Sequence, residues 1–465
     1  MAGAAPRLIG WATRWTMLYR DWMAGRKGHV AEHNEIAKRL VNVRDFQTIQ
    51  AAIDYAKPDG IPVYFPPGDY VLSEALNFTG GKSGWRIYGA GKLVTRIHGN
   101  LTEAYPVMDC ANTMVCLEDL HILGGGEATC GVLLARGHDA SGYHGDDSFL
   151  QNVMVSGTFS KAAVANIGAD LSCLVHCALY GPISYFIGCT PNSLVESFGF
   201  ASKFVQDIGG DSTLHELYGC TLVANERCGV LNVKGAVEIS GCTCALSGAA
   251  TALVELADGG MGYGKATFLR NSRLEVDSSV RHPVHILNVV NGSSGGVISG
   301  QYGCVKGPYI NIQNGQYLQN YDINFAPGNL WDFDTALATD GAQGDDHIHV
   351  NSSDGFADGD CIEIMLNAGG QINYVNGTPI GDLIALKHLL SGPSNAGHKV
   401  YRKLDLVGGG GSMTDSMVRN SNNLGGRLEM GWNNIVRAWT PNAWPTLDLA
   451  GHSNIWMGLS RTSSH

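Results

Sequence analysis

Two glutamates, Glu216 and Glu238, have the type and spacing that acid–base cleavage of a glycosidic bond would need. Each stands at the first position of a short repeated segment, and the two lie 22 residues apart. If each repeat is one coil of stacked strands, neighbouring coils lie about 4.8 Å apart and the carboxylates share a face. Carboxyl groups about 5 Å apart suit a retaining glycosidase, and pairs about 6.5–9.5 Å apart suit an inverting one. Arg270, one coil further on, is the predicted substrate-binding cation beside them.

The first position of these repeats is seldom acidic, and this leaves two interpretations of the pair open. Other repeats carry Cys116, Phe149, Cys173 and Phe268 there, so the position is often buried. Two carboxylates forced together at a half-buried position raise the pKa of one of them, which a general acid requires. The alternative interpretation is a solvated corner at which the two side chains do no chemistry.

Asp146 and Asp170 form a second candidate pair of catalytic carboxylates. They lie 24 residues apart, and each stands three residues before a repeated segment. The segment Gly145-Asp146-Asp147 resembles the paired-aspartate motif of the polygalacturonase-type glycoside hydrolases. The resemblance implies that Asp147 contacts substrate, and nearby His144 would assist a base or cap the turn. The Asn-Thr-Asp, Gly-His-Gly and Arg-Ile-Lys segments of that family are missing, so a plain Asp-Asp turn is the alternative.

The sequence predicts no cofactor and no metal site. The strand His347-Ile348-His349 places two imidazoles on one face beside Asp345 and Asp346, but a further ligand is not identifiable. An exposed strand face is the simpler interpretation. The segment Gly89-Ala90-Gly91-Lys92 precedes no predicted helix, so it lacks the context of a phosphate-binding loop.

A short pattern recurs through the middle of the chain and must position these residues. Positions two, five and seven are mostly apolar, and position four is Asn, Asp, Gly or His, which suits a bend. An irregular period of roughly 20–30 residues with short β segments predicts a solenoid of stacked coils. The interval of 43 residues between the third and fourth segments predicts one unmarked coil around residues 186–200. The segments are CLEDLHILG (Cys116–Gly124), FLQNVMVSG (Phe149–Gly157), CLVHCALYG (Cys173–Gly181), ELYGCTLVA (Glu216–Ala224), EISGCTCAL (Glu238–Leu246) and FLRNSRLEV (Phe268–Val276).

The block before these repeats predicts a helix followed by strands. An amphipathic helix beginning at Phe46 ends before Pro58, and short strands follow at Val63–Phe65, Tyr70–Leu72 and Arg96–His98. This order resembles the opening of the pectate-lyase-like right-handed parallel β-helices, a group that includes many bacteriophage tailspikes. The resemblance implies an all-β fold, a right-handed parallel β-helix whose open end the helix caps. The calcium-dependent lyases of that group need clustered acids, and no acidic triad at coil spacing is evident here.

The composition fits this fold and excludes several classes of protein. Glycine makes up 62 of 465 residues, nearly twice the usual share, and charged residues are only 16%, against about 25% in average proteins. The net charge of −11 argues against a nucleic-acid binder, which needs a basic face. No apolar run is long enough for a signal peptide or a membrane span, because Arg7, Arg14 and Arg20 interrupt the N-terminal region. The 12 cysteines are scattered, which predicts core thiols.

Four regions are expected along the chain. Residues 1–45, with tryptophans at helical spacing, are predicted to be a helical virion-attachment or trimerisation region, and residues 46–326 the β-helix. Residues 327–407 are predicted to be a small C-terminal β-rich domain, and residues 408–465 a tail or tip. Gly408–Gly411 is expected to be a flexible joint between the last two regions.

These features together predict a phage tailspike or tail-fibre protein that recognises a bacterial surface polysaccharide. The expected partners are that glycan, other phage tail or baseplate proteins, and two further copies of the chain in a homotrimer. The expected location is the virion, after synthesis in the host cytoplasm.

Whether the protein cleaves the glycan or only binds it stays open, because the same fold class hosts hydrolases, lyases and binders. A glycoside hydrolase with paired carboxylates fits better than a calcium-dependent lyase. The alternatives are a cellular pectinase-like glycoside hydrolase or polysaccharide lyase, and a structural tail component without a ligand.

Overall fold

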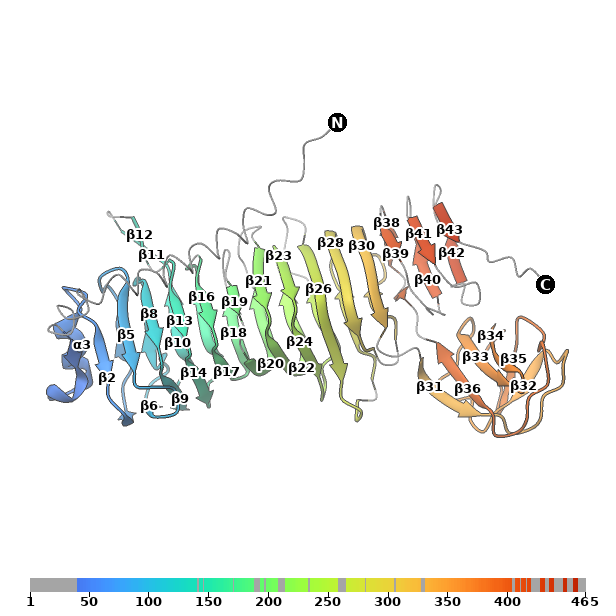
Figure 1. The fold of residues 1–465 in the computed structure, drawn as a ribbon, viewed down its shortest axis with the longest axis horizontal. Helices are drawn as coiled ribbons and strands as arrows, with labels where there is room; N and C mark the ends of the chain where they lie inside the picture. The colour runs from blue at the N-terminus through green and yellow to red at the C-terminus, as the bar shows by residue number, and fades with distance from the viewer. Residues whose placement is uncertain are drawn as a thin grey trace, which may run out of the picture.

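The chain forms an elongated row of β strands with a helix at one end and a smaller β unit at the other (Figure 1). A computed structural model describes residues 40–139, 142–144, 146–169, 171–187, 193–195, 198–207, 214–232, 235–257, 265–280, 282–304, 307–327, 331–403, 406–409, 411–414, 416–419, 427–430, 435–438, 446–449 and 455–458. Within these ranges, α3 (Ile49–Ala56) is the one α-helix. No helix in these ranges is long and apolar enough to cross a membrane.

Parallel strands in this part of the chain form three stacks, which the chain visits in turn in each coil. Stack one contains β1 (Val41–Asn42), β2 (Val63–Phe65), β5 (Trp85–Gly89), β8 (Val115–Glu118), β13 (Phe149–Gln151), β16 (Cys173–Val175), β19 (Ser193–Val195), β21 (Leu214–Tyr218) and β23 (Ala236–Ser240), then the first parts of β26 (Lys265–Val276), β28 (Ser293–Tyr302) and β30 (Tyr317–Pro327).

Stack two contains β3 (Gly68–Leu72), β6 (Thr95–Leu101), β9 (His121–Gly126), β14 (Met154–Gly157) and β17 (Ala178–Tyr180), then the first parts of β20 (Phe198–Asp207) and β22 (Thr221–Asn232), β24 (Thr243–Leu246), and the second parts of β26, β28 and β30. Stack three contains β4 (Leu76–Asn77), β7 (Met108–Asp109), β10 (Cys130–Ala135), β15 (Ala162–Ile167) and β18 (Ile183–Ile187), the second parts of β20 and β22, β25 (Ala252–Leu256), β27 (His285–Val289) and β29 (Ile310–Ile312).

One row of apolar side chains explains why the coils of stack one stay in register. The second position of every repeat points inward, and its residue pairs with the equivalent residue of the next coil. Each inward side chain therefore meets a similar one above and below, and sliding a strand by one residue would expose the whole row. The inward side chains of the row are Ile87, Leu117, Leu150, Leu174, Leu217, Ile239, Leu269, Ile298 and Ile323, and the backbone of β19 continues the pairing between Leu174 and Leu217.

The predicted bend at the fourth position of each repeat is confirmed. In all six segments this residue has a left-handed backbone with φ between 49° and 63°. Asn, Asp and Gly tolerate this conformation better than other residues do, so the choice of residue follows from the bend. The six positions are Asp119, Asn152, His176, Gly219, Gly241 and Asn271. The unmarked coil expected around residues 186–200 is also confirmed, because β19 pairs with both β16 and β21.

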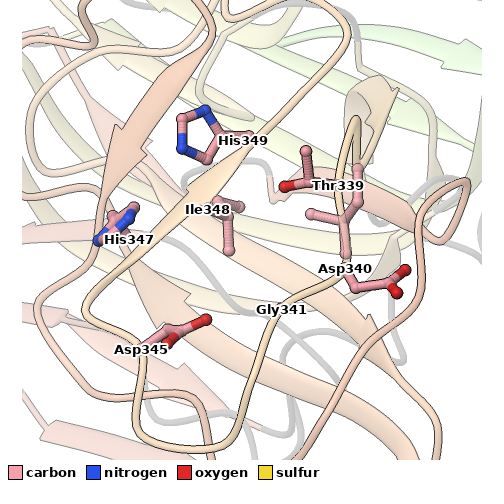
Figure 2. A pocket seen from close by; sticks show the side chains of 8 residues that line it. Thr339, Asp340, Gly341, Asp345, His347, Ile348 and His349 are labelled. Carbon is pink, nitrogen blue, oxygen red and sulfur yellow. The ribbon is translucent and has the colours of Figure 1, made fainter.

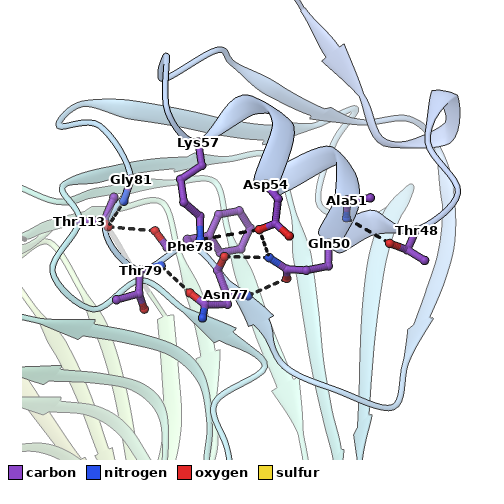
Figure 3. A network of polar contacts seen from close by, with 10 residues as sticks. All are labelled: Thr48, Gln50, Ala51, Asp54, Lys57, Asn77, Phe78, Thr79, Gly81 and Thr113. Carbon is purple, nitrogen blue, oxygen red and sulfur yellow. Dashed lines mark hydrogen bonds and ion pairs between the residues drawn. The ribbon is translucent and has the colours of Figure 1, made fainter.

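Helix α3 covers the N-terminal end of the apolar core and begins later than predicted (Figure 1). It starts at Ile49 because the Thr48 side chain caps it, with Oγ1 accepting a hydrogen bond from Ala51 N at 3.1 Å. Figure 3 shows how Gln50 attaches the helix to β4: Nε2 donates to Asn77 O at 3.1 Å, and Oε1 accepts from Asn77 N at 3.0 Å. Ile53, on the inner face of the helix, is fully buried.

The smaller β unit has its own core, and in sequence it is inserted between β30 and the strands after residue 406. Strands β31 (Trp331–Ala336), β36 (Lys399–Lys403), β33 (Cys361–Leu366) and β34 (Gly369–Tyr374) form an antiparallel sheet, and β32 (His347–His349) pairs with β35 (Leu383–Ala385). Twelve buried apolar residues between Leu337 and Val400 form its core.

After this unit the chain rejoins the stacks. Strand β37 (Val407–Gly408) pairs with β29, and β38 (Ser412–Thr414) and β39 (Met417–Arg419) pair with β30. Strands β40 (Arg427–Met430) and β42 (Thr446–Leu449) follow β37, and β41 (Ile435–Ala438) and β43 (Ile455–Gly458) follow β39. The expected flexible joint is therefore wrong at Gly408, which belongs to a paired strand.

The predicted all-β class with parallel sheets is confirmed, and the right-handed solenoid and the division into four regions stay predictions. The helical region expected at 1–45 lies outside the described residues up to position 39; β1 and a 3₁₀ turn at Val43–Asp45 occupy its end. Ten cysteines whose side chains the structure describes are free thiols, and nine of them are buried while Cys116 is half-buried.

Candidate functional site

Glu216 and Glu238 are direct neighbours on the outer face of stack one. Glu216 on β21 pairs in register with Glu238 on β23, and both side chains are half-buried. The residues beside them along each strand, such as Leu217 and Ile239, point into the core. The coil spacing therefore places two carboxylates next to each other on the surface, as the sequence predicts.

The two carboxylates have different surroundings. Arg270 on β26 places Nε 3.5 Å from Glu238 Oε1, and its guanidinium lies 5.5 Å from the centroid of the Phe268 ring. Burial nevertheless raises the pKa of Glu238, with Arg270 opposing this and the neighbouring Glu216 adding to it. Glu216 instead accepts a hydrogen bond from the Tyr218 hydroxyl, with Oε1 at 3.1 Å. Burial raises the pKa of Tyr218, so this hydroxyl keeps its proton to donate.

Tyr218 and Phe268 are parts of this cluster that the sequence analysis did not include. Tyr218 lies two residues after Glu216 on the same strand, so both side chains project from the same face. Phe268 pairs in register with Glu238 and carries Arg270 against its ring. The alternation of strand side chains would have identified Tyr218, whereas the orientation of Arg270 has no signal in the sequence.

Aromatic side chains lie on the same outer face nearer the helix-capped end. Tyr64 on β2 and Tyr88 on β5 have ring centroids 5.1 Å apart, and the Arg86 guanidinium lies 4.8 Å from the Tyr88 centroid. Arg86 also forms an ion pair with Glu118 of the next coil at 2.8 Å. The five coil steps from β5 to β21 separate this group from Glu216 by roughly 24 Å.

The second predicted pair is only partly described. Asp146 forms two hydrogen bonds with Arg136, at 3.1 and 2.9 Å, so its carboxylate is held by a cation. Asp147 follows with a left-handed backbone, and burial and the neighbouring Asp146 raise its pKa. The backbone of His144 belongs to the hairpin of β11 (Gly137–Asp139) and β12 (Gly142–His144), and its side chain is outside the description. Asp170 also lies outside the described residues, so its pairing with Asp146 stays a prediction.

The described residues hold no cluster of three or more His, Cys, Asp or Glu side chains that could bind a metal ion. The cluster at Glu216 and Glu238 presents two carboxyl groups, a phenol and a guanidinium on the outer face of stack one.

No protein-family model matches the chain, and no curated protein matches it. Several solved structures are similar at low identity. ORF18 of Geobacillus virus E2 is 14% identical with a TM-score of 0.36, over 78% of this chain and 80% of that one. The tailspike protein gp49 from Pseudomonas phage LKA1 is 11% identical with a TM-score of 0.39, over 77% and 93%. The catalytic domain of a GH87 α-1,3-glucanase in complex with nigerose is 10% identical with a TM-score of 0.39, over 92% and 66%.

Proposed function

We propose that this protein is a phage tailspike or tail-fibre protein that binds a bacterial surface polysaccharide along the outer face of stack one and hydrolyses it. The observation that carries the proposal is the pair of register-matched glutamates with contrasting surroundings, Glu216 and Glu238. A carboxyl group with a raised pKa beside a second carboxyl group can serve as the acid while the other serves as the nucleophile or base.

In this mechanism Glu238 is the general acid and Glu216 is the nucleophile or the general base. The raised pKa of Glu238 keeps a larger fraction of it protonated, so that it can give its proton to the leaving glycosidic oxygen. Glu216, which accepts a hydrogen bond from Tyr218, acts on the anomeric carbon as a nucleophile or through a water molecule. Arg270 would bind substrate hydroxyls and orient Glu238.

The aromatic group near the cap supports binding of an extended chain. Tyr64 and Tyr88 are half-buried on this face, and an aromatic ring with a hydroxyl can contact both the apolar and the polar parts of a sugar. Their separation of roughly 24 Å from Glu216 matches a glycan several sugar units long lying parallel to the row of strands. A right-handed β-helix that forms a homotrimer and is attached to the virion by its N-terminal region completes the proposal. The sequence of the Phe46–Gly99 block supports the β-helix.

The test is the release of reducing ends from a panel of bacterial surface polysaccharides. Glu216→Gln and Glu238→Gln are each expected to lower kcat by about 10²–10⁴-fold, because general acid–base catalysis is worth that much. The matched control is Glu275→Gln, since Glu275 forms an exposed ion pair with Arg273 at 2.8 Å on stack two and should leave the rate unchanged. Asp146→Asn tests the second predicted pair in the same assay.

Three results would contradict all or part of the proposal. Full activity in both Glu216→Gln and Glu238→Gln would remove the carboxylate pair from the mechanism. A purified chain that light scattering finds to be a monomer at micromolar concentration would argue strongly against the tailspike assembly. A polysaccharide that binds with these residues but is never cleaved would reduce the proposal to glycan recognition alone.

A further inference from the structure

Three asparagines of this chain are followed directly by glycine. An Asn-Gly pair can react within its own backbone, because glycine has no side chain to hinder the approach of its nitrogen to the asparagine side chain. The glycine amide must lose its proton in this reaction, so its hydrogen-bond partners decide whether the pair reacts. The three pairs all lie in the described part of the chain and are Asn291-Gly292, Asn314-Gly315 and Asn376-Gly377.

Two of the three glycine amides are held by a side-chain oxygen. Gly377 N donates a hydrogen bond to Asp358 Oδ1 at 2.7 Å, and Gly292 N donates to Gln316 Oε1 at 2.9 Å. Each bond stabilises the protonated form of the amide, and a nitrogen anion beside the Asp358 carboxylate would also be repelled by its charge. Both pairs are therefore protected in the folded chain.

The third pair lies in an exposed turn between β29 and β30. Gln316 N donates to Gln313 O at 2.9 Å and closes this turn. Gly315 has a φ of 79°, which suits the position that a type II turn reserves for glycine. Asn314 and Gly315 are both exposed, and within the described residues the Gly315 amide donates to no protein acceptor. A Cβ placed on Gly315 would meet no atom within 4 Å apart from its chain neighbours, so the pair has room to react.

We propose that Asn314 is a site of spontaneous deamidation, which converts it into an aspartyl or isoaspartyl residue. Gly315 N forms a bond to Asn314 Cγ and closes a succinimide ring, while the side-chain nitrogen leaves as ammonia with the proton of the amide. One water molecule then opens the ring at either of its two carbonyl carbons. The reaction needs only water, and it does not depend on the proposed hydrolysis of a polysaccharide.

The product would alter the turn through which the last coil meets the strands that follow the small unit. Either product adds a negative charge, and the isoaspartyl product also adds one carbon atom to the backbone of the turn. Gln316, two residues after Asn314, bonds Gly292 through its side chain and accepts a hydrogen bond from Ser412 N at 3.0 Å through its carbonyl. A lengthened turn therefore strains the contact by which β38 joins the stacks.

Peptide mapping by mass spectrometry tests the proposal on the full chain, incubated in mildly alkaline buffer with and without guanidinium chloride. In the folded protein, conversion at Asn314 should be roughly tenfold faster than at Asn376, whose glycine amide bonds a carboxylate. It should be several-fold faster than at Asn291, whose glycine amide bonds a neutral oxygen. In guanidinium chloride the three rates should become similar, and labelling by an isoaspartyl methyltransferase identifies the isoaspartyl product.

The protective role of Asp358 is tested by Asp358→Ala. This variant removes the acceptor at Gly377, so conversion at Asn376 should accelerate roughly tenfold while conversion at Asn314 stays unchanged.

The matched control is Asp345→Ala, in the loop before β32 (Figure 2). Asp345 Oδ2 also accepts from a backbone amide of the small unit at 2.7 Å, but this amide, Ala342 N, does not follow an asparagine. Asp345→Ala should therefore leave conversion at Asn376 unchanged.

Three results would overturn the proposal. The first is equal conversion at all three asparagines in the folded protein, or slower conversion at Asn314 than at either of the others. The second is the same ranking of the three rates in guanidinium chloride, which would assign the ranking to the local sequence. The third is an equal acceleration at Asn376 in Asp358→Ala and Asp345→Ala, which would assign protection to the general rigidity of the small unit.

Discussion

Replacing Arg270 by methionine tests whether its charge sets the protonation of Glu238. The Arg270 Nε and Glu238 Oε1 atoms lie 3.5 Å apart, and unit charges at that distance attract by about 1.2 kcal/mol in water. The Arg270 side chain is 42% exposed, so the interaction energy should fall within the range measured for exposed ion pairs. Removing the charge should therefore lower the free energy of unfolding by about 1 kcal/mol, which corresponds to a rise of roughly 0.7 unit in the pKa of Glu238. Methionine can still pack against Phe268, so the change removes the charge and keeps the contact.

The pH dependence of this loss distinguishes the charge from packing. The pKa of Glu238 is already raised in the folded state, so the folded protein holds this proton more tightly than the unfolded chain does. At a pH well below about 4.3, the pKa of Glu in an unfolded chain, Glu238 is protonated in both states and its raised pKa does not change the free energy of unfolding. As the pH rises from that value through the folded pKa, the free energy of unfolding falls. Arg270→Met raises the folded pKa further, so its extra destabilisation should be present at neutral pH and absent in acid.

Urea unfolding at both pH values measures this, because urea does not screen charges. Arg270→Lys, which keeps the charge, should lose much less stability at neutral pH. In a Glu238→Gln background, Arg270→Met should show no pH-dependent loss. An equal loss at acid and neutral pH, or a loss that persists in the Glu238→Gln background, would refute the reasoning.

Three further predictions concern the fold. Leu217→Ala should lower the free energy of unfolding, measured in urea, by about 2–5 kcal/mol, because Leu217 is 2% exposed within the inward row of stack one. The control Val71→Ala, at a position 74% exposed, should change it by less than about 0.5 kcal/mol. Similar losses in the two variants would contradict the assigned row. The Asn271→Val variant should be less stable than Asn271→Gly by about 1–2 kcal/mol, because the backbone at residue 271 has a φ of 49°, which disfavours a branched side chain. Equal stability of the two variants would mean that the bend lies elsewhere. Thr48→Ala should destabilise helix α3 by about 1 kcal/mol and speed hydrogen exchange at the Ala51 amide, because the capping hydrogen bond is lost. Thr48→Ser keeps a hydroxyl and should restore the protection of that amide. Unchanged exchange in Thr48→Ala would mean that the cap is not needed.

The parts of the fold that repeat could be predicted from the sequence. The bend residue and the inward apolar residue recur at fixed positions in each segment, so Asn152 and Leu217 could be assigned before any coordinates. Alignment of the segments also made neighbours of Glu216 and Glu238, because parallel strands in register place equivalent residues side by side.

What depends on side-chain orientation or on distant pairing could not be predicted. The sequence does not say that Arg270 turns toward Glu238, or that Arg136 reaches Asp146. The sequence also does not indicate that the chain rejoins the stacks after residue 403, because β37 is two residues long and pairs with β29, a strand almost 100 residues earlier. Helix α3 starts three residues after Phe46 since a local cap, and not the apolar period, sets its first turn.

The most direct test of the central claim is a crystal structure of the Glu238→Gln variant with an oligosaccharide cut from a polysaccharide that the unaltered protein degrades. The account predicts that the sugar lies along the outer face of stack one, with a glycosidic oxygen within hydrogen-bond distance of the side chain at position 238 and the anomeric carbon facing Glu216. An oligosaccharide bound with its scissile bond beside Asp146, or on a face away from both glutamates, would contradict it.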